Sequence, residues 1–433
     1  MTINVAVIGS GPSGFYTVDA LRKANRDVRV DIIDRLPTPF GLIRGGVAPD
    51  HQTTKKVARV YEKSALADGV AYYGNVEVGR DVSIEELKGM YDAIVLAVGA
   101  PRDRKLGIPG EDKTGVFGSA DFVGWYNGHP DFTDLAPDLN TSTVVVIGNG
   151  NVAVDAARVL VKTDEEMTAT DLADHASDAI QASPITDVYM VGRRGPIEAK
   201  FTNVELREMG KLNNCMPIID ASQLPESIEG EWSDRDLRLK ERNLATMKEF
   251  SNVDPTGKGK RVHFAFYSKP VEILGSENVE GIRMEHTKVE GGRSVGTGEF
   301  FVIECGLVIP AIGYLSDPFP GVPFDDDNGI VIHDEGRVGD NIYAVGWIKR
   351  GPTGVIGSNK PDGDIAATQI FEDVAEGSKP GREALNAILS ERNVRVVSYQ
   401  DWQTIDAAEV SGAKPGAPRR KLVTIDAMVA ALD

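Results

Sequence analysis

The segment Gly9-Ser10-Gly11-Pro12-Ser13-Gly14 spaces three glycines in the pattern G-x-G-x-x-G. Glycines at these positions suit the binding of a pyrophosphate by backbone N–H groups at the start of a helix. The first glycine, Gly9, permits a tight turn, and the second, Gly11, lets the backbone approach a phosphate closely. The third, Gly14, allows the helix to pack tightly against the preceding strand.

The residues around this turn supply the elements that it needs. The apolar, β-branched run at residues 3–8 predicts a strand buried on both faces, and residues 15–24 predict a helix. A second strand at residues 28–33 ends at Asp34, where a carboxylate accepts hydrogen bonds from the ribose of an adenosine. Together these features predict a dinucleotide site in a β-α-β unit.

A second turn of the same type follows later in the chain. Gly148-Asn149-Gly150-Asn151-Val152-Ala153 lies between a strand pattern at residues 143–147 and a helical pattern at residues 152–162. The next predicted strand, at residues 187–191, is followed by Arg193 and Arg194 instead of an acid. Two guanidinium groups suit a 2′-phosphate, so the pair favours NADP over NAD. The alternative is a pair of solvated surface arginines.

Two such units in one chain imply two bound dinucleotides. In duplicated architectures of this kind the first position usually holds FAD, which stays bound, and the second holds NADPH, which exchanges. The arrangement serves to bring nicotinamide C4 against flavin N5.

Further segments predict the rest of the scaffold. Residues 36–51 form a long loop rich in Pro and Gly, which is typical of a binding loop. The sequence patterns also predict strands at residues 93–98, 303–312 and 342–346, an inserted helix pair within 164–183, and a peripheral helix within 226–260. The glycine-rich turn at residues 351–357 precedes a helix predicted from about Asp362 to Ala375. The amides of that turn could face the flavin N1/C2=O edge; the alternative is a simple helix start.

Composition excludes several other classes of protein. The 433 residues are 41% hydrophobic and 26% charged, which is typical of a globular chain, and the net charge of −18 predicts an acidic surface. Such a surface disfavours nucleic acid and anionic membranes as partners. The two cysteines form no C-x-x-C pair, so we expect no dithiol centre, iron–sulfur cluster or metal site. We find no segment typical of a membrane span or a targeting peptide, which predicts a cytoplasmic protein.

Several segments together resemble a known family. The sequence is similar to the adrenodoxin-reductase-like ferredoxin–NADP⁺ reductases, FAD-dependent enzymes with bacterial members, within the wider two-dinucleotide flavoprotein group that includes glutathione reductase. The resemblance covers essentially the whole chain. It is carried by both glycine turns and by residues 36–42, 46–51, 108–112, 191–196 and 346–357.

The resemblance implies an α/β fold of the glutathione-reductase type, with two Rossmann-like dinucleotide-binding domains. The NADP-binding domain, residues 105–313, would be inserted into the FAD-binding domain. Residues 1–104 and 314–433 would form that FAD domain, including a C-terminal tail after Lys379 whose role the sequence leaves open.

The resemblance also implies which residues contact the cofactors. Those expected at FAD are Ser13, Asp34, Leu42, Val78, Trp347, Gly354, Val355 and Ile356. Those expected at NADP are Arg104, Asn149, Gly150, Asn151, Val152, Arg193, Arg194, Glu205 and Gly354. His51 and Glu208 would lie near the contact of nicotinamide and flavin, with a polar link between them, and would tune orientation or proton balance. The alternative for His51 is a loop histidine that only satisfies local hydrogen bonds.

The function implied is electron transfer from NADPH, as hydride to FAD and then singly to a ferredoxin-type iron–sulfur protein. Disulfide-reducing relatives carry a C-x-x-x-x-C near the first glycine turn, which is absent here. Alternatives are a reductase of quinones or other small molecules, an electron-input subunit similar to the glutamate synthase small subunit, and a non-catalytic nucleotide sensor. An acidic ferredoxin would need a basic docking face. Candidates are Lys349 with Arg350, and Arg419-Arg420-Lys421, although solvated charges are the alternative. We expect a monomer or weak dimer.

Overall fold

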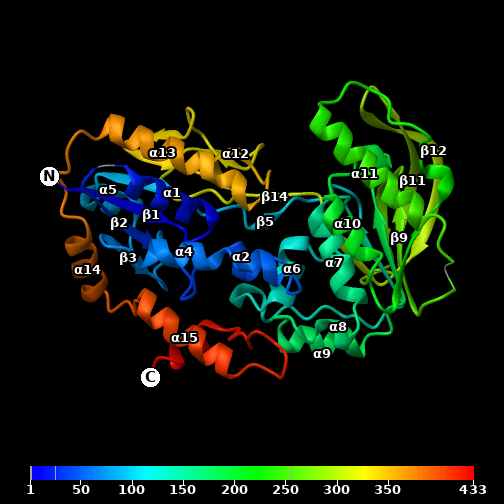
Figure 1. Cartoon of the computed structure of the whole chain (residues 1–433), viewed down its shortest axis with the longest axis horizontal. Coiled ribbons are helices and arrows are strands. Elements are labelled where there is room, and N and C mark those ends of the chain that lie inside the picture. Colours follow the sequence, from blue (N-terminus) through cyan, green and yellow to red (C-terminus); the bar gives the residue numbers. More distant parts are fainter. Residues whose placement is uncertain (1, 25, 255) are drawn as a thin grey trace. The chain divides into compact units, whose positions relative to one another are not determined.

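The computed structural model describes residues 2–24, 26–254 and 256–433. The chain divides into two compact units (Figure 1). The first unit runs to Arg102 and includes Asn127–Pro130 and Tyr314–Asp433, and the second contains Asp103–Tyr126 and Asp131–Gly313.

The first unit is built on a six-stranded sheet with the order β17-β18-β4-β1-β2-β3. All neighbouring strands in it are parallel except β17 and β18. The strands are β1 (Ile3–Ile8), β2 (Val28–Ile33), β3 (Val70–Tyr73), β4 (Ala93–Leu96), β17 (Arg337–Gly339) and β18 (Ile342–Ala344). The strands predicted at residues 3–8 and 28–33 are confirmed at both ends, and those at 93–98 and 342–346 end two residues earlier.

Both faces of this sheet are buried, as the continuous apolar run of β1 predicts. Val5 and Val7 pack into one cluster with side chains of the helices on one face, whereas Ala6 and Ile8 pack into a second cluster on the other. This two-sided burial is the reason that β1 shows no alternation of polar and apolar residues.

The helices of the first unit include the tail that the sequence left unexplained. They are α1 (Pro12–Lys23), α2 (Leu42–Gly45), α3 (Gln52–Lys55), α4 (Ala58–Ala65), α5 (Ile84–Met90), α12 (Trp347–Arg350), η4 (Ile356–Asn359), α13 (Lys360–Asp373), α14 (Arg382–Glu391), α15 (Tyr399–Ser411) and α16 (Ile425–Ala430). In the tail, α14 packs on α5 and α15 on β3 (Figure 1). Leu385, Trp402, Ile405 and Met428 lie in the core, so the tail is part of this fold.

The second unit contains a five-stranded parallel sheet with the order β13-β6-β7-β9-β8. Its strands are β6 (Thr143–Ile147), β7 (Asp187–Val191), β8 (Cys215–Ile219), β9 (Lys260–Ala265) and β13 (Leu307–Pro310). Val144 and Val146 face a cluster with the helices, and Val145 and Ile147 face a second sheet. That second sheet is antiparallel and consists of β10 (Ser268–Leu274), β11 (Gly281–Glu290) and β12 (Arg293–Glu304).

The single strand predicted at residues 303–312 was wrong, because β12 ends at Glu304 and β13 begins at Leu307. Gly306 lies between them, and a Cβ there would be 2.9 Å from Thr141 Oγ1, so the chain turns at a position where only glycine fits. The sequence patterns also missed the sheet of β10, β11 and β12. Exposed positions of β12 include the hydrophobic residues Val295, Phe300 and Val302, so its strands show no regular alternation of polar and apolar residues.

The helices of the second unit follow the sequence prediction closely. They include α6 (Ser119–Asn127), α7 (Asn151–Val161), α8 (Asp164–Met167), α9 (Asp174–Ala182), α10 (Asn203–Met209) and α11 (Asp234–Phe250). The predicted inserted pair is α8 and α9, and the predicted peripheral helix is α11. No helix among the described residues is long and apolar enough to cross a membrane.

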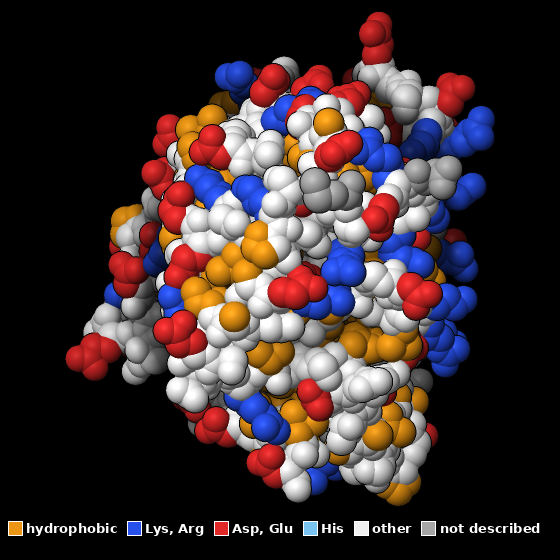
Figure 2. Space-filling model, turned by 90° about the vertical axis from the view of Figure 1, so that its left-hand side faces the viewer, with side chains coloured by type: hydrophobic (Ala, Val, Ile, Leu, Met, Phe, Trp, Pro, Cys, Tyr) orange, Lys and Arg blue, Asp and Glu red, His pale blue; other side chains and the backbone are white. Residues whose placement is uncertain are grey.

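Basic side chains accompany the acidic ones on the face of the molecule in Figure 2. Figure 2 shows one side of the molecule, where acidic and basic side chains lie interspersed among small apolar areas. On this face the uniformly acidic surface suggested by the net charge is not seen. A local docking surface for a charged partner therefore has to be judged from individual side chains.

Candidate dinucleotide sites and family membership

The first glycine turn has the geometry that its three glycines predict. Gly9 has a φ of +104°, and a Cβ there would lie 2.5 Å from the carbonyl oxygen of Ala97 in the neighbouring strand connection. A Cβ at Gly14 would lie 2.1 Å from the carbonyl oxygen of Gly9. A Cβ at Gly11, by contrast, would meet nothing within 4 Å. Gly11 therefore borders open space at the start of α1, where the backbone can receive a phosphate.

Asp34 lies at the end of β2 beside this turn. Its Oδ2 accepts hydrogen bonds from the Ser10 amide at 2.8 Å and the Ser10 hydroxyl at 2.5 Å, and its Oδ1 accepts one from the Leu36 amide at 3.0 Å. A carboxylate can accept about four hydrogen bonds, so one place remains for a ribose hydroxyl. The cleft beside it is lined by Asp34, Leu36, Thr38, Pro39, Gly41, Arg44, Gly45 and residues 127–130.

The loop at residues 36–51 is held from the C-terminal tail. Arg44 donates to both carboxylate oxygens of Glu409 at 2.8 and 2.5 Å, and Glu409 is fully buried on α15. The same carboxylate accepts the amide of Leu422 at 2.8 Å and a bond from Arg419 at 3.1 Å. The tail thus fixes the loop that carries Leu42, whose side chain is 44% exposed.

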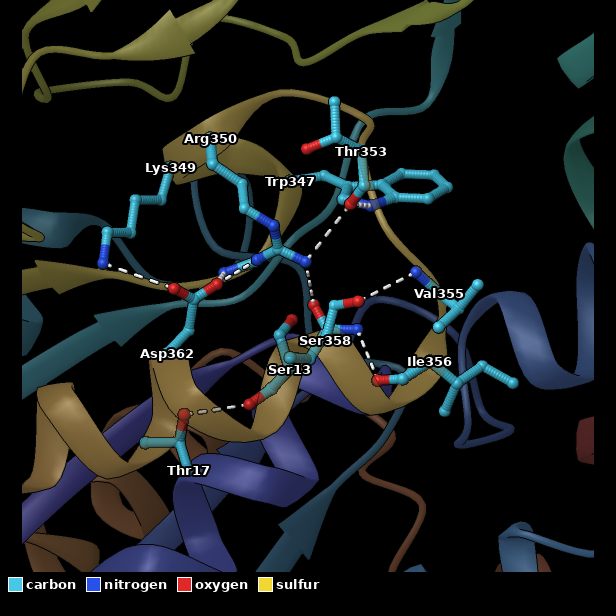
Figure 3. A network of polar contacts seen from close by, with 12 residues as sticks. Ser13, Thr17, Trp347, Lys349, Arg350, Thr353, Val355, Ile356, Ser358 and Asp362 are labelled. Atoms are coloured by element: carbon cyan, nitrogen blue, oxygen red, sulfur yellow. Dashed lines mark hydrogen bonds and ion pairs between the residues drawn. The ribbon is translucent and has the colours of Figure 1, made fainter. Parts of the chain in front are cut away.

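The C-terminal strand of the sheet delivers a second segment to the same turn (Figure 3). Gly346 follows β18 with a φ of +72°, and a Cβ there would lie 2.7 Å from the Ser13 side chain. The Trp347 indole N–H donates to the carbonyl oxygen of Thr353 at 3.2 Å, which closes the loop before Gly354. The segment 346–356 therefore lies against the start of α1, as a cofactor shared by both would require.

The turn at Gly354 differs in detail from the prediction. It opens a short 3-10 helix, η4, and α13 begins at Lys360, two residues before the predicted start. The Val355 amide, one of the groups expected to face the flavin, donates to Ser358 Oγ at 3.0 Å (Figure 3). The Val355 side chain is 64% exposed, which leaves an apolar contact surface at this turn.

Lys349 and Arg350, the first candidates for a docking face, are engaged in internal ion pairs, and their docking role stays a prediction. Both side chains form ion pairs with the carboxylate of Asp362, at 3.3 Å for Lys349 (Figure 3). Asp362 also accepts the Gly346 amide at 3.0 Å, and Arg350 donates to Asn359 at 2.9 Å. The carboxylate of Asp362 is largely buried and needs positively charged partners. Its ion pairs with the two cations therefore hold the loop at residues 346–356 in place.

In the second candidate docking run, two of the three residues also make internal contacts. Arg419 pairs with Asp406 and with the buried Glu409. Lys421 is 8% exposed and donates to the carbonyl oxygens of Arg44 and Asn127. Arg420 is the exposed member of the run. Basic residues adjacent in the sequence thus serve internal contacts here.

Two further predicted residues lie in the first unit. Val78 is half-buried against the core and forms a bridge with Val82. His51 is half-buried at the start of α3, and its amide donates to the carbonyl oxygen of Ala48 at 3.0 Å. The roles expected for these residues stay predictions.

The second glycine turn repeats the geometry of the first. Gly148 has a φ of +151°, and a Cβ there would lie 2.3 Å from the carbonyl oxygen of Ala311. A Cβ at Gly150 would meet nothing within 4 Å, and Ala153, in the third position, is fully buried. The start of α7 therefore offers a second place for a pyrophosphate.

Asparagines shape this second turn. Asn151 Oδ1 accepts the amide of Thr202 at 2.8 Å, which ties the turn to the start of α10. Asn149 Oδ1 is buried and has no hydrogen-bond partner among the described residues. A buried, unsatisfied acceptor costs free energy, so a donor from a bound nucleotide would complete the site. Val152 is half-buried and packs against the core.

Arg193 and Arg194 follow β7, and their backbone is fixed. The Arg193 carbonyl oxygen accepts the Thr287 hydroxyl at 2.8 Å, and that of Arg194 accepts the Tyr267 amide at 3.1 Å. Neither guanidinium forms an ion pair with any described residue. Burial lowers the pKa of Lys240, and the positive charge of Arg194 adds to this effect. The charges of Glu198 and Asp236 act on Lys240 in the opposite direction. The two guanidiniums at the end of β7 therefore remain the groups that favour an anionic ligand such as a 2′-phosphate.

Three predicted residues remain in the second unit. Arg104 is exposed, and its amide donates to the carbonyl oxygen of Gly313 at 3.0 Å. Glu205 and Glu208 lie one turn apart on α10, and both approach Arg158 of α7. Glu208 and His51 lie in different units, so their expected polar link stays a prediction.

Comparisons with known proteins agree over nearly the whole chain. A family model described as pyridine nucleotide-disulphide oxidoreductase matches residues 3–190. The mitochondrial NADPH:adrenodoxin oxidoreductase of Arabidopsis thaliana is 41% identical, with 99% of this chain and 95% of that protein covered. NADPH-ferredoxin reductase FprA of Mycobacterium tuberculosis is 40% identical, with 97% of each covered. The solved structure of M. tuberculosis FprA in complex with NADPH matches with a TM-score of 0.95 and 37% identity, covering 100% of both chains.

The chain belongs to the adrenodoxin-reductase family of NADPH–ferredoxin reductases.

Membership confirms the resemblance and the fold class inferred from the sequence, an α/β fold of the glutathione-reductase type. One feature separates this chain from the disulfide chemistry in the name of the family model. Its cysteines, Cys215 and Cys305, are both free and buried, and burial raises the pKa of each thiol to about 12. Thiols held protonated in this way are poor nucleophiles, so neither suits an internal redox disulfide.

Proposed function

We propose that this chain oxidises NADPH with the help of FAD and passes the electrons to a small iron–sulfur protein of the ferredoxin type. The observation that carries the proposal is the pair of matching turns, each with an open second glycine at the start of a helix. The overall reaction balances as NADPH plus two oxidised one-electron carriers giving NADP⁺, one proton and two reduced carriers. The printed names of the relatives, NADPH-ferredoxin reductase and NADPH:adrenodoxin oxidoreductase, support this assignment.

The first unit has the residues that FAD requires. Gly11 leaves room for the pyrophosphate, Asp34 retains an acceptor position for the ribose, and Gly346 brings the C-terminal segment against Ser13. When bound, FAD accepts a hydride and releases its two electrons singly, which matches a two-electron donor to one-electron acceptors. The protein positions the ring, and exposed Val355 and Leu42 offer apolar surface near it.

The second unit has the residues for NADPH in preference to NADH. Arg193 and Arg194 follow β7, where an acidic residue would repel a 2′-phosphate, and their guanidiniums form no ion pair with the described part of the chain. The orphaned Asn149 Oδ1 and the open space at Gly150 complete the nucleotide site. Glu205 and Glu208 on α10 would face the nicotinamide half.

His51 and Glu208 would act on orientation and proton balance. Hydride transfer moves no separate proton, so neither residue needs to be an acid or base in that step. The proton that accompanies reoxidation has to leave the site, and a histidine side chain is suited to carry it. We expect substitution of either residue to alter the pH dependence of turnover.

The route by which electrons leave separates the alternatives. A quinone or small-molecule reductase would work at full rate without a protein carrier, and an electron-input subunit would copurify with a larger partner. The two buried cysteines disfavour an internal disulfide as the electron acceptor, so the electrons pass to an external acceptor. This observation does not distinguish a ferredoxin from a small molecule or from a larger partner complex. The unpaired cysteines also suit the reducing cytoplasm that we propose as its compartment.

The experiment that tests this function is a comparison of acceptors with the purified holoenzyme. NADPH-dependent cytochrome c reduction should be slow alone and rise strongly when ferredoxin is added, and quinones should not replace ferredoxin. If docking is electrostatic, the ferredoxin-dependent rate should fall as salt increases. Equal rates with and without ferredoxin would reject the protein acceptor in favour of a small molecule.

A further inference from the structure

Arg158 is the largest side chain that is fully buried in the described chain, and it is a cation. It lies on α7, two turns after the second glycine turn. An arginine inside an apolar helix face is costly unless carboxylates surround it, because a buried charge needs partners. The charged groups around Arg158 therefore indicate its role.

Three carboxylates surround this guanidinium. Asp155, one turn earlier on α7, lies 2.8 Å away. Glu205 and Glu208 come from α10, at 3.3 and 3.6 Å from the same nitrogen of Arg158. The two glutamates lie on one face of α10 because they are three residues apart. Among the described groups the cluster carries one positive and three negative charges.

The glutamates are more exposed than the arginine that holds them. Their side chains are 16% and 33% exposed, for Glu205 and Glu208, whereas Arg158 is 0% exposed. The buried guanidinium thus supports two carboxylates that are themselves partly exposed. The start of α10 is also tied to the nucleotide turn through the Thr202 amide and Asn151.

We propose that Arg158 is a positioning residue of the NADP site, which holds Glu205 and Glu208 side by side and ionised on α10. This inference rests on the proposed function, in which these two glutamates face the nicotinamide half of the nucleotide. Arg158 acts through them and does not itself touch the nucleotide. Nothing in the spacing of the glycine turn predicts it, because its two glutamate partners on α10 are about fifty residues away in the sequence.

Removal of the cation should change the charge state of its partners. Without Arg158, three carboxylates share one buried region, and their mutual repulsion raises the pKa of at least one of them. We expect this repulsion to push α10, which carries two of the carboxylates, away from α7. Because protonation of a carboxylate relieves the repulsion, binding of NADP⁺ to the variant should become dependent on pH. In the native protein the guanidinium keeps the glutamates ionised, and binding should vary little over the neutral range.

The test is calorimetric titration of NADP⁺ into the holoenzyme over the neutral pH range, with unfolding temperature measured in parallel. Arg158→Met should weaken binding by about tenfold or more, with tighter binding as the pH falls. Arg158→Lys keeps the charge but cannot bridge two carboxylates, so a loss of about threefold is expected, with little pH dependence. Arg207→Met changes an exposed arginine on α10, the helix that carries Glu205 and Glu208, and should leave binding and activity unchanged.

The inference is overturned if Arg158→Met is folded and binds NADP⁺ within about twofold of the native protein at every pH. If Arg158→Met does not fold, the lysine variant decides, and native affinity in that variant overturns the inference. Flavin content and bleaching by NADPH in the native protein test the proposed function separately. A native protein that fails them but still binds NADP⁺ leaves the Arg158 measurement intact.

Discussion

Arg193 and Arg194 offer the sharpest test of cofactor preference. We predict that replacing both with alanine weakens the use of NADPH and leaves the use of NADH nearly unchanged. Their carbonyl oxygens are held by Thr287 and Tyr267, so the loop should keep its path when the side chains are removed. The change therefore removes charge and hydrogen-bond donors and little else.

The size of the effect follows from exposure. A hydrogen bond to a charged group contributes roughly 1.5–3 kcal/mol. Arg193 is exposed, so ~1 kcal/mol is reasonable for it, and half-buried Arg194 should contribute ~2 kcal/mol. The sum of ~3 kcal/mol corresponds to a rise of about 100-fold to 200-fold in KM for NADPH, since 1.4 kcal/mol is tenfold.

Steady-state kinetics with both nucleotides provide the measurement. The double variant should raise KM for NADPH by this factor with little loss of kcat, because the phosphate contacts are the same in the ground and transition states. KM for NADH should change less than about twofold. Exposed Arg207 on α10, changed to alanine, serves as the control for loss of a surface arginine. An equal loss with NADPH and NADH would refute the assignment of the 2′-phosphate site.

Three other outcomes are expected. Gly11→Val should fold with native stability but bind less FAD, since the added side chain occupies the open space. Gly14→Ala should instead destabilise the chain, because a Cβ there lies 2.1 Å from a carbonyl oxygen. Measurements of flavin content and of thermal unfolding distinguish the two effects. Burial raises the pKa of Asp103 to about 6, so the folded chain binds the extra proton and loses stability as the pH rises through that value. Above that pH, Asp103→Asn should therefore have a free energy of unfolding ~1–3 kcal/mol higher than the native protein. Below the pKa that Asp103 has in the unfolded chain, the two should be nearly equally stable, and urea unfolding at several pH values measures the difference. Finally, Cys215 and Cys305 should react with a thiol reagent only after unfolding, and rapid native labelling would contradict their burial.

The sequence predicted the parts of the site that depend on local backbone geometry. Both glycine turns, the strands before them and Asp34 were found because their chemistry needs fixed residue types at fixed spacing. Helices α8, α9 and α11 were predicted only as an inserted pair within residues 164–183 and a peripheral helix within residues 226–260. The residues that form each of these features are close together in the sequence, so their interactions can be predicted from local patterns.

What the sequence did not predict depends on long-range contacts. The sequence alone indicates that Arg350 is a surface cation, whereas in the structure it forms an ion pair with Asp362. Likewise, the ion pair of Glu409 with Arg44, which shows that the C-terminal tail supports the loop at residues 36–51, is visible only in the fold. Arg158 was missed for the same reason. A signal was present in each case, since a charged residue within an apolar stretch needs a partner, but the sequence alone does not say which.

Anaerobic titration of the purified protein with NADPH tests the central claim most directly. The account predicts a yellow protein whose flavin absorbance is bleached by one equivalent of NADPH and restored by two equivalents of oxidised ferredoxin. A colourless protein that takes up no FAD on reconstitution, or a flavin that NADPH does not bleach, would contradict it.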